Sequence, residues 1–105
     1  MMENKVKGLL GLSRRAGKLS PGHDAAVSSI KKRKAFLAIT CNDCSQRLKD
    51  EIKDECNFDG RNIPYRDAPF TMEELNVALG IRAGVIAIDD KNLAKELYKL
   101  TGGNE

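Results

Sequence analysis

The sequence predicts an α/β fold, a three-layer α/β/α sandwich around a small mixed sheet. Short apolar runs at residues 35–40 and 85–88 are typical of buried strands, and they alternate with longer segments whose apolar residues recur at helical spacing. The 105 residues, of which 41% are hydrophobic and 31% charged, suffice for one compact domain. We therefore expect a single domain over residues 1–100, followed by a flexible tail at residues 101–105.

The first helix is predicted before a glycine turn. Residues 3–15 place Val6, Leu9 and Leu10 on one helical face, and Gly17 fits the C-terminal cap. The polar and basic residues of the segment are left for the other faces, as in an amphipathic helix that covers a sheet.

A second helix is expected to start at the Ser-Pro pair of residues 20–21, because proline is favoured at the first helical position. A very short extended piece at residues 18–19 would precede it. The apolar stripe of this helix lies within residues 26–30, and the basic run at residues 31–34 follows where positive charge complements the helix dipole.

The rest of the chain is predicted to alternate strands and helices. Residues 35–40 indicate a strand covered on both faces, and residues 63–66 indicate a strand near an edge, since a proline lies within them. A third helix places Leu48, Ile52 and Cys56 inward, and a fourth helix runs from a capping box at Thr71 to Gly80 with Leu75, Ala78 and Leu79 facing inward. A strand at residues 85–88 follows. The last helix is capped by residues 89–90 and has Leu93, Leu97 and Leu100 at core spacing.

Charge is distributed unevenly along the chain. The net charge is +3, but residues 1–53 carry +7 and residues 54–105 carry −4. Such asymmetry points to nucleic acid or another polyanion as a partner of the N-terminal half. A basic helical face that only keeps the protein in solution explains the charge equally well. The absence of tryptophan and the low aromatic content of 5% argue against an extensive base-stacking platform.

No segment predicts secretion or membrane insertion. No apolar run approaches the roughly 20 residues that a membrane span needs, and the first residues contain no apolar signal core. We therefore expect a cytoplasmic protein without a membrane partner.

The three cysteines are expected to be reduced, because an odd count does not indicate a disulfide framework. Cys41 and Cys44 follow a predicted strand and open a helix, where a redox dithiol would be stabilised. A zinc site would need Cys56 and His23 as well, from separate segments. Buried, unpaired thiols are the simpler interpretation, and we expect neither a metal nor a cofactor.

No catalytic arrangement is evident in the sequence. His23 is the single histidine, and no serine or cysteine nucleophile is set beside it. The glycine-containing residues 17–22 lack the Gly-Lys-Ser/Thr ending of a phosphate-binding P-loop. The carboxylates Asp50, Glu51, Asp54 and Glu55 occupy the exposed side of the third helix rather than a cleft. We therefore expect no catalytic residues, no enzyme activity and no small-molecule substrate.

Two stretches are candidates for a binding surface. The first, residues 14–27, combines three basic side chains with two glycines and the helix-start signal, which would place backbone N–H groups and positive charge in front of a phosphate. The second, residues 66–71, is a loop that presents Phe70 beside a proline, although Phe70 is equally suited to a hydrophobic staple before the helix cap. If both stretches lie at one edge of the domain, residues 14–27 would hold an RNA backbone and residues 66–71 would cover an unstacked base.

Several short motifs stand in a fixed order along the chain: LSRRAGKLSPG at residues 12–22, KAFLAI at 34–39, NDCS at 42–45, IPY at 63–65, ELxxALG at 74–80 and VIAID at 85–89. Their order and spacing resemble the ribosomal protein L7Ae and L30e superfamily over about residues 4–100, most closely its bacterial YlxQ-like branch. The resemblance implies an α/β/α sandwich that binds RNA, in many relatives a kink-turn, which is a sharply bent internal loop with tandem G·A pairs.

The start of the second helix departs from the pattern of kink-turn binders. In those relatives this helix opens with Gly, followed by Asn and Glu and later by Lys. Here Gly22 matches, whereas Asp24, Ala25 and Ser28 stand at the three other positions. A carboxylate at Asp24 would repel phosphates, and Ala25 lacks a group that hydrogen-bonds to a base edge.

The resulting expectation is a non-catalytic RNA-binding protein, a ribosome-associated ribonucleoprotein component whose partner is structured RNA, such as ribosomal RNA. The alternative is a protein-interaction or regulatory domain of the same fold that has lost kink-turn recognition. A thiol-redox protein is a third reading. The expected RNA-binding residues are Arg14, Arg15 and Lys18 on phosphates, Gly22, His23, Asp24, Ser28 and Lys31 along the second helix, and Ala68, Pro69 and Phe70 over an unstacked nucleotide.

Overall fold

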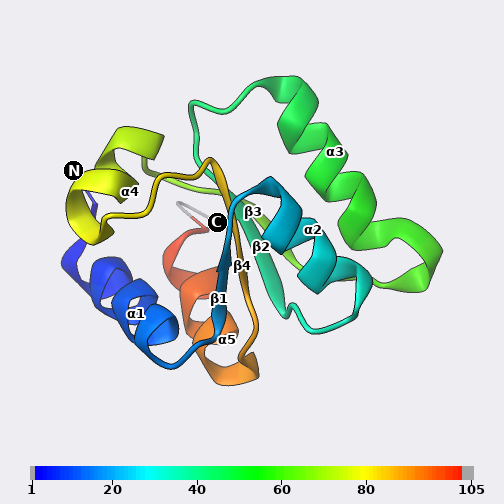
Figure 1. Cartoon of the computed structure of the whole chain (residues 1–105), viewed down its shortest axis with the longest axis horizontal. Coiled ribbons are helices and arrows are strands. Elements are labelled where there is room, and N and C mark those ends of the chain that lie inside the picture. Colours follow the sequence, from blue (N-terminus) through cyan, green and yellow to red (C-terminus); the bar gives the residue numbers. More distant parts are fainter. Residues whose placement is uncertain (1, 103–105) are drawn as a thin grey trace.

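Helices and strands alternate along residues 2–102, which are the residues that this computed structural model describes (Figure 1). In chain order the elements are α1 (Asn4–Arg15), β1 (Leu19–Pro21), α2 (His23–Lys31), β2 (Leu37–Thr40), α3 (Gln46–Asn57), the short 3₁₀ helix η1 (Phe58–Gly60), β3 (Tyr65–Asp67), α4 (Met72–Leu79), β4 (Val85–Ile88) and α5 (Lys91–Leu100).

The strands form one mixed sheet in the order β1-β4-β2-β3. β4 runs antiparallel to both of its neighbours, and β2 and β3 are parallel. The three-residue strand β3 lies at an edge, with Pro64 immediately before it, as expected for a residue that cannot donate to a ladder.

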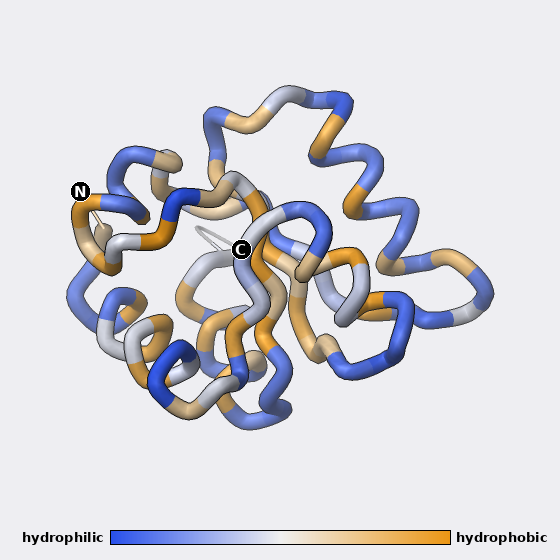
Figure 2. Tube along the Cα trace, in the orientation of Figure 1, coloured by the Kyte–Doolittle hydropathy of each residue, from blue (hydrophilic) through white to orange (hydrophobic). Residues whose placement is uncertain are grey.

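Helices cover both faces of this sheet. In β2, Leu37 and Ile39 belong to one core cluster together with residues of α1, α4 and α5, whereas Ala38 belongs to a second cluster with residues of α2 and α3. β4 alternates in the same way, with all four of its residues buried. Figure 2 shows the sheet as a hydrophobic centre within more hydrophilic helices. The predicted three-layer α/β/α sandwich around a mixed sheet is confirmed.

The start of the second helix was expected at the Ser-Pro pair, and this expectation is wrong. Ser20 and Pro21 form part of β1, where Pro21 lies opposite Ile86 of β4, and α2 begins only at His23. Gly22 separates the two elements with a φ of 91°, a conformation that glycine adopts readily and that no helix contains. Proline is accommodated because β1 is an edge strand.

Four of the α-helices begin at a residue whose side chain caps them, and two of these caps lie where the sequence predicted capping, at Thr71 and within residues 89–90. Glu3, Ser45, Thr71 and Asp90 each accept a hydrogen bond from a backbone N–H of the helix that follows, and Thr71 and Glu74 form the predicted capping box. These caps fix the starts of α1, α3, α4 and α5. The helix α2 differs, because its N-cap residue is Gly22.

Asp89 does not share the capping role that was expected of residues 89–90. Its two carboxylate oxygens accept hydrogen bonds from Ser20 Oγ at 2.7 Å and Ser29 Oγ at 2.5 Å. These bonds connect the residue after β4 to β1 and to the C-terminal half of α2. The position of α2 relative to the sheet is therefore fixed by polar contacts as well as by its apolar face.

The packed part of the chain extends just beyond α5. Thr101 is buried, and its hydroxyl donates a hydrogen bond to the carbonyl of Leu97 at 2.6 Å. The expected flexible tail at residues 101–105 therefore begins after Thr101 at the earliest, and residues 103–105 lie outside the described part of the chain. Within residues 2–102, no helix has the length and apolar character that a membrane span requires.

Candidate nucleic-acid interface

One end of the sheet gathers four chain segments. The strands β1, β2 and β3 end there, and β4 begins there. Across the sheet, the end of β1 is followed by the start of β4, then by the end of β2 and the end of β3. We call the surface formed by residues 21–24, 41–45, 68–71 and 80–84 the sheet-end surface. It contains the observed start of α2 and most of the loop that the sequence predicted to face RNA.

Backbone hydrogen bonds connect these segments to one another. The N–H of Gly22 donates to the carbonyl of Val85 at 2.8 Å, and the N–H of Cys41 donates to the carbonyl of Gly84 at 2.8 Å. The N–H of Asn42 donates to the carbonyl of Phe70 at 2.9 Å. The sheet-end surface is therefore a continuous framework rather than a set of independent loops.

The N-terminus of α2 is open at this surface. Gly22 is its N-cap residue and has no side chain to accept from the first turn, and the first helical bond runs from the N–H of Ala26 to the carbonyl of Gly22 at 2.9 Å. The N–H groups of residues 23–25 precede that bond and point along the helix axis. Among the α-helices of residues 2–102, α2 alone lacks a capping side chain. Such a terminus favours an anionic ligand.

His23 connects this helix start to α3. Its Nε2 lies 2.6 Å from Glu51 Oε2, and its Nδ1 lies 3.3 Å from Asp24 Oδ1. The hydrogen bond to Glu51 is the larger cause that raises the pKa of His23 above its ordinary value, and the hydrogen bond to Asp24 is the next. The imidazole is half-exposed, so its proton can be gained or lost in contact with solvent.

The residues that depart from the kink-turn pattern differ in accessibility. The side chain of Asp24 is fully exposed in the first turn of α2, and Ala25 beside it is exposed as well. Ser28 is partly buried one turn further along. Asp24 therefore brings a negative charge to the open helix start, and the exposed methyl group of Ala25 offers no hydrogen bond.

The basic residues of the predicted binding stretch do not gather at this helix start. The carbonyl of Lys18 accepts from Asp89 at the far end of β4, so Lys18 and Gly22 are separated by the length of β1, about 13 Å. Arg14 donates to the carbonyl of Leu79, at the C-terminus of α4. Lys31 is the last residue of α2 and lies at the opposite end of that helix from Gly22. The stretch is thus divided between the two ends of β1.

The loop at residues 66–71, which was expected to cover a nucleotide with Phe70, does not expose that ring. Phe70 is 1% exposed and Ala68 is 2% exposed, and both belong to the core cluster that contains Leu75. The Phe70 ring therefore packs inside, next to the helix cap, which corrects the expectation that it is presented to a ligand. Pro69 is the exposed residue of the three.

Two residues of the sheet-end surface escaped the sequence analysis. Arg82 is exposed in the segment between α4 and β4, and no described residue forms an ion pair or hydrogen bond with it. Gly84 is packed so closely that a Cβ atom there would lie 2.8 Å from Cys44 Sγ. The available signal was a basic residue and a glycine directly before a buried strand. Only the strand order shows that this strand begins where β1 ends and α2 starts.

The cysteines are part of the core. Cys41, Cys44 and Cys56 are free and buried. Burial raises the pKa of the Cys41 thiol to about 12 and that of Cys56 to about 11, and it raises the pKa of Cys44 as well. These are inert rather than activated thiols, so the geometry gives no support to a redox dithiol. Residues 2–102 also contain no group of three or more His, Cys, Asp or Glu side chains placed to hold a metal ion.

Comparisons with known proteins agree with this fold. The sequence profile of the ribosomal protein L7Ae/L30e/S12e/Gadd45 family matches residues 4–98. The chain is 30% identical over 99 residues to the RNA-binding protein YlxQ of Enterococcus faecium, covering 94% of this chain and 93% of that protein. It is also 30% identical over 97 residues to the RNA-binding protein YlxQ of Bacillus subtilis (strain 168), covering 88% and 90%.

A solved structure shows the same architecture. It is that of a protein with unknown function from Bacillus halodurans, which superposes with a TM-score of 0.84 at 27% identity and covers 95% of this chain and 99% of its own. The predicted resemblance is confirmed over nearly the whole chain: it belongs to the ribosomal protein L7Ae/L30e/S12e/Gadd45 family.

Proposed function

We propose that this protein binds structured RNA, without catalysis, through the sheet-end surface. The observation that carries the proposal is the open N-terminus of α2, which lies at the sheet end in a chain whose relatives are named RNA-binding proteins. Its free N–H groups would hold a phosphate or a base-edge acceptor, and the absence of a Cβ atom at Gly22 allows close approach.

Neighbouring groups complete the proposed contact. Arg82, which is exposed in the segment that leads into β4, would supply a cation to the sheet-end surface. Pro69 and the backbone around it would pack on a protruding nucleotide, in place of the buried Phe70 ring. Binding by this surface depends more on backbone groups and shape than on base-edge contacts, because Ala25 has no polar side-chain atom.

The test compares three RNAs at several salt concentrations: a kink-turn RNA, the same RNA with its G·A pairs replaced, and total ribosomal RNA. Binding to the kink-turn over its control would identify kink-turn recognition. Binding to ribosomal RNA alone would identify a ribosomal target. No binding to any of them at low salt would overturn the proposal and favour a protein-interaction domain.

A matched pair of variants locates the surface. We expect Arg82→Ala to weaken RNA binding about five- to tenfold and to reduce the salt slope by about one, since one phosphate contact is lost. Lys5→Ala removes the same charge from the exposed face of α1 and should leave the affinity unchanged. Equal effects of the two substitutions would mean that only net charge matters and that the sheet-end surface is not the interface.

A further inference from the structure

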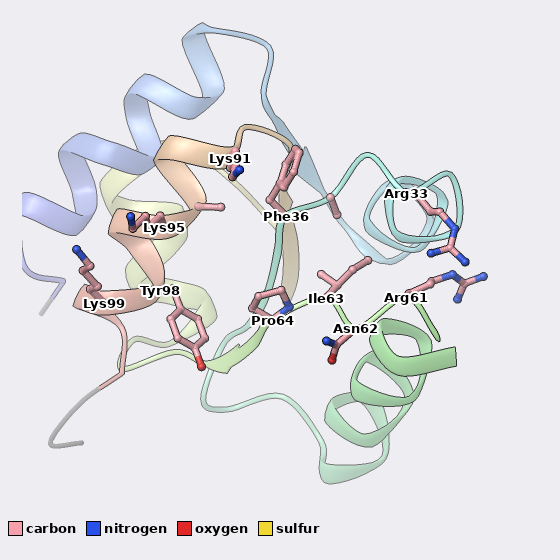
Figure 3. A pocket seen from close by; sticks show the side chains of 12 residues that line it. Arg33, Phe36, Arg61, Asn62, Ile63, Pro64, Lys91, Lys95, Tyr98 and Lys99 are labelled. Atoms are coloured by element: carbon pink, nitrogen blue, oxygen red, sulfur yellow. The ribbon is translucent and has the colours of Figure 1, made fainter. Parts of the chain in front are cut away.

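A groove opens at the other end of the sheet, away from the sheet-end surface. It encloses about 700 Å³ between α5 on one side and the segment before β3 on the other (Figure 3). Phe36 and Pro64 mark its position, because they immediately precede β2 and β3 and therefore lie where those strands begin. We call this feature the α5 groove.

The floor of the α5 groove is apolar and contains aromatic rings. Phe36 is 44% exposed and Tyr98 is 39% exposed, so both present ring surface to solvent. Ile63 and Pro64, from the segment before β3, line the groove beside these rings (Figure 3). Arg66 lies over the Tyr98 ring with its guanidinium carbon 3.6 Å from the ring centroid, which holds that ring in place.

One wall of the groove carries a row of lysines. Lys91, Lys95 and Lys99 follow one another at four-residue spacing along α5, about 6 Å apart along the helix axis. Lys99 lies 3.8 Å from a carboxylate oxygen of Glu96. For Lys91 and Lys95, no carboxylate of residues 2–102 lies within ion-pair distance.

The opposite wall also contains basic side chains, but these already bind other groups of the protein. The Arg61 guanidinium contacts Glu55 Oε1 at 3.1 Å and the Glu55 carbonyl at 2.8 Å. Arg33 donates to the carbonyl of Asp59 at 3.1 Å. Asn62, the residue after Arg61, is exposed and lies below Ile63 in the close-up view, apart from the two arginines (Figure 3). Available positive charge is therefore concentrated on the α5 wall.

We propose that the α5 groove binds a short single-stranded RNA segment, with phosphates on the lysines of α5 and bases over Phe36 and Tyr98. A single strand carries its charge along one side and its bases along the other, which matches one cationic wall beside an aromatic floor. An acidic amphipathic peptide would carry carboxylates on both sides of its apolar stripe, and the partnered Arg61 leaves one side without a counter-charge. The RNA class rests on the proposed function, whereas the groove itself is independent of the sheet-end surface.

The experiment measures fluorescence anisotropy of labelled hexauridine and hexaadenosine RNA with the full chain. We expect the double variant Lys91→Ala, Lys95→Ala to weaken binding about tenfold and to lower the salt slope by about 1.4, since single strands lose roughly 0.7 per contact. Phe36→Leu keeps an apolar side chain but removes the ring, and it should weaken binding at least about fivefold. The control Lys5→Ala, Lys7→Ala removes equal charge from α1.

The outcomes separate the two sites. Loss of hexanucleotide binding in both groove variants, with Arg82→Ala unaffected, supports the α5 groove even if no structured RNA binds the sheet-end surface. Hexanucleotide binding that is absent, or is reduced equally by the α1 control, overturns the inference. So does binding of an acidic amphipathic peptide in place of RNA. Circular dichroism melting of each variant verifies that it is folded.

Discussion

Asp24 brings two opposing effects to a single position. Its carboxylate lies in the first turn of α2, where negative charge stabilises a helix by about 0.3–1 kcal/mol, yet the same charge opposes a phosphate at that terminus. We expect Asp24→Asn to lower the melting temperature slightly and to tighten RNA binding roughly two- to fivefold. Thermal melts and anisotropy titrations on the same sample measure both. Weaker RNA binding by this variant would show that Asp24 contacts the RNA favourably.

His23 makes stability depend on pH. The hydrogen bonds to Glu51 and then Asp24 raise its folded-state pKa above the ordinary 6.5, so the folded state binds the proton more tightly than the unfolded state. This contribution is fully present below pH 6.5 and is lost as the pH rises through the raised pKa. Urea unfolding between pH 5.5 and 9 should show a fall in stability that is flattened in His23→Gln. Glu51→Gln should flatten the pH dependence similarly. An unchanged pH profile in both variants would show that His23 does not cause the pH dependence of stability.

At the scale of elements, the contact of Gly84 with the start of α3 and α4 controls how closely the segments of the sheet-end surface approach. A Cβ atom there would lie 2.8 Å from Cys44 Sγ and 3.1 Å from Met72 Sδ. Met72 can move, but Cys44 is buried and short. We expect Gly84→Ala to destabilise the fold by about 1–3 kcal/mol in chemical denaturation. Gly8→Ala in α1, where nothing lies within 4 Å, should instead stabilise by up to about 1 kcal/mol.

Local signals predicted most elements, and pairing between distant segments decided the rest. The capping box at Thr71 and the apolar runs of β2 and β4 depend on near neighbours, so the sequence sufficed. The Ser-Pro pair suits both a helix start and an edge strand, and only its pairing opposite Ile86 selects the strand. The same pairing places Lys18 and Gly22 at opposite ends of β1 and connects Gly22 to the start of β4, which sequence spacing alone does not reveal.

Across the whole molecule, the cysteines can report on folding. Cys41 and Cys44 belong to the core cluster under α1, α4 and α5, whereas Cys56 belongs to the cluster under α2 and α3. Because burial raises all three pKa values, thiol reagents should label the protein only as it unfolds. The labelling curve in urea should coincide with the circular dichroism curve for a two-state domain. Rapid labelling of Cys41 or Cys44 in the native protein would reopen the redox reading.

The backbone framework of the sheet-end surface also bears on how such a protein changes over evolution. The bonds from Gly22 to Val85, from Cys41 to Gly84 and from Asn42 to Phe70 use main-chain atoms alone. Replacement of an exposed side chain such as Asp24 or Arg82 therefore leaves the scaffold standing. Single substitutions on this surface can therefore change which ligand is bound while the protein stays folded. The same tolerance makes this surface suitable for a combinatorial library selected against new RNAs.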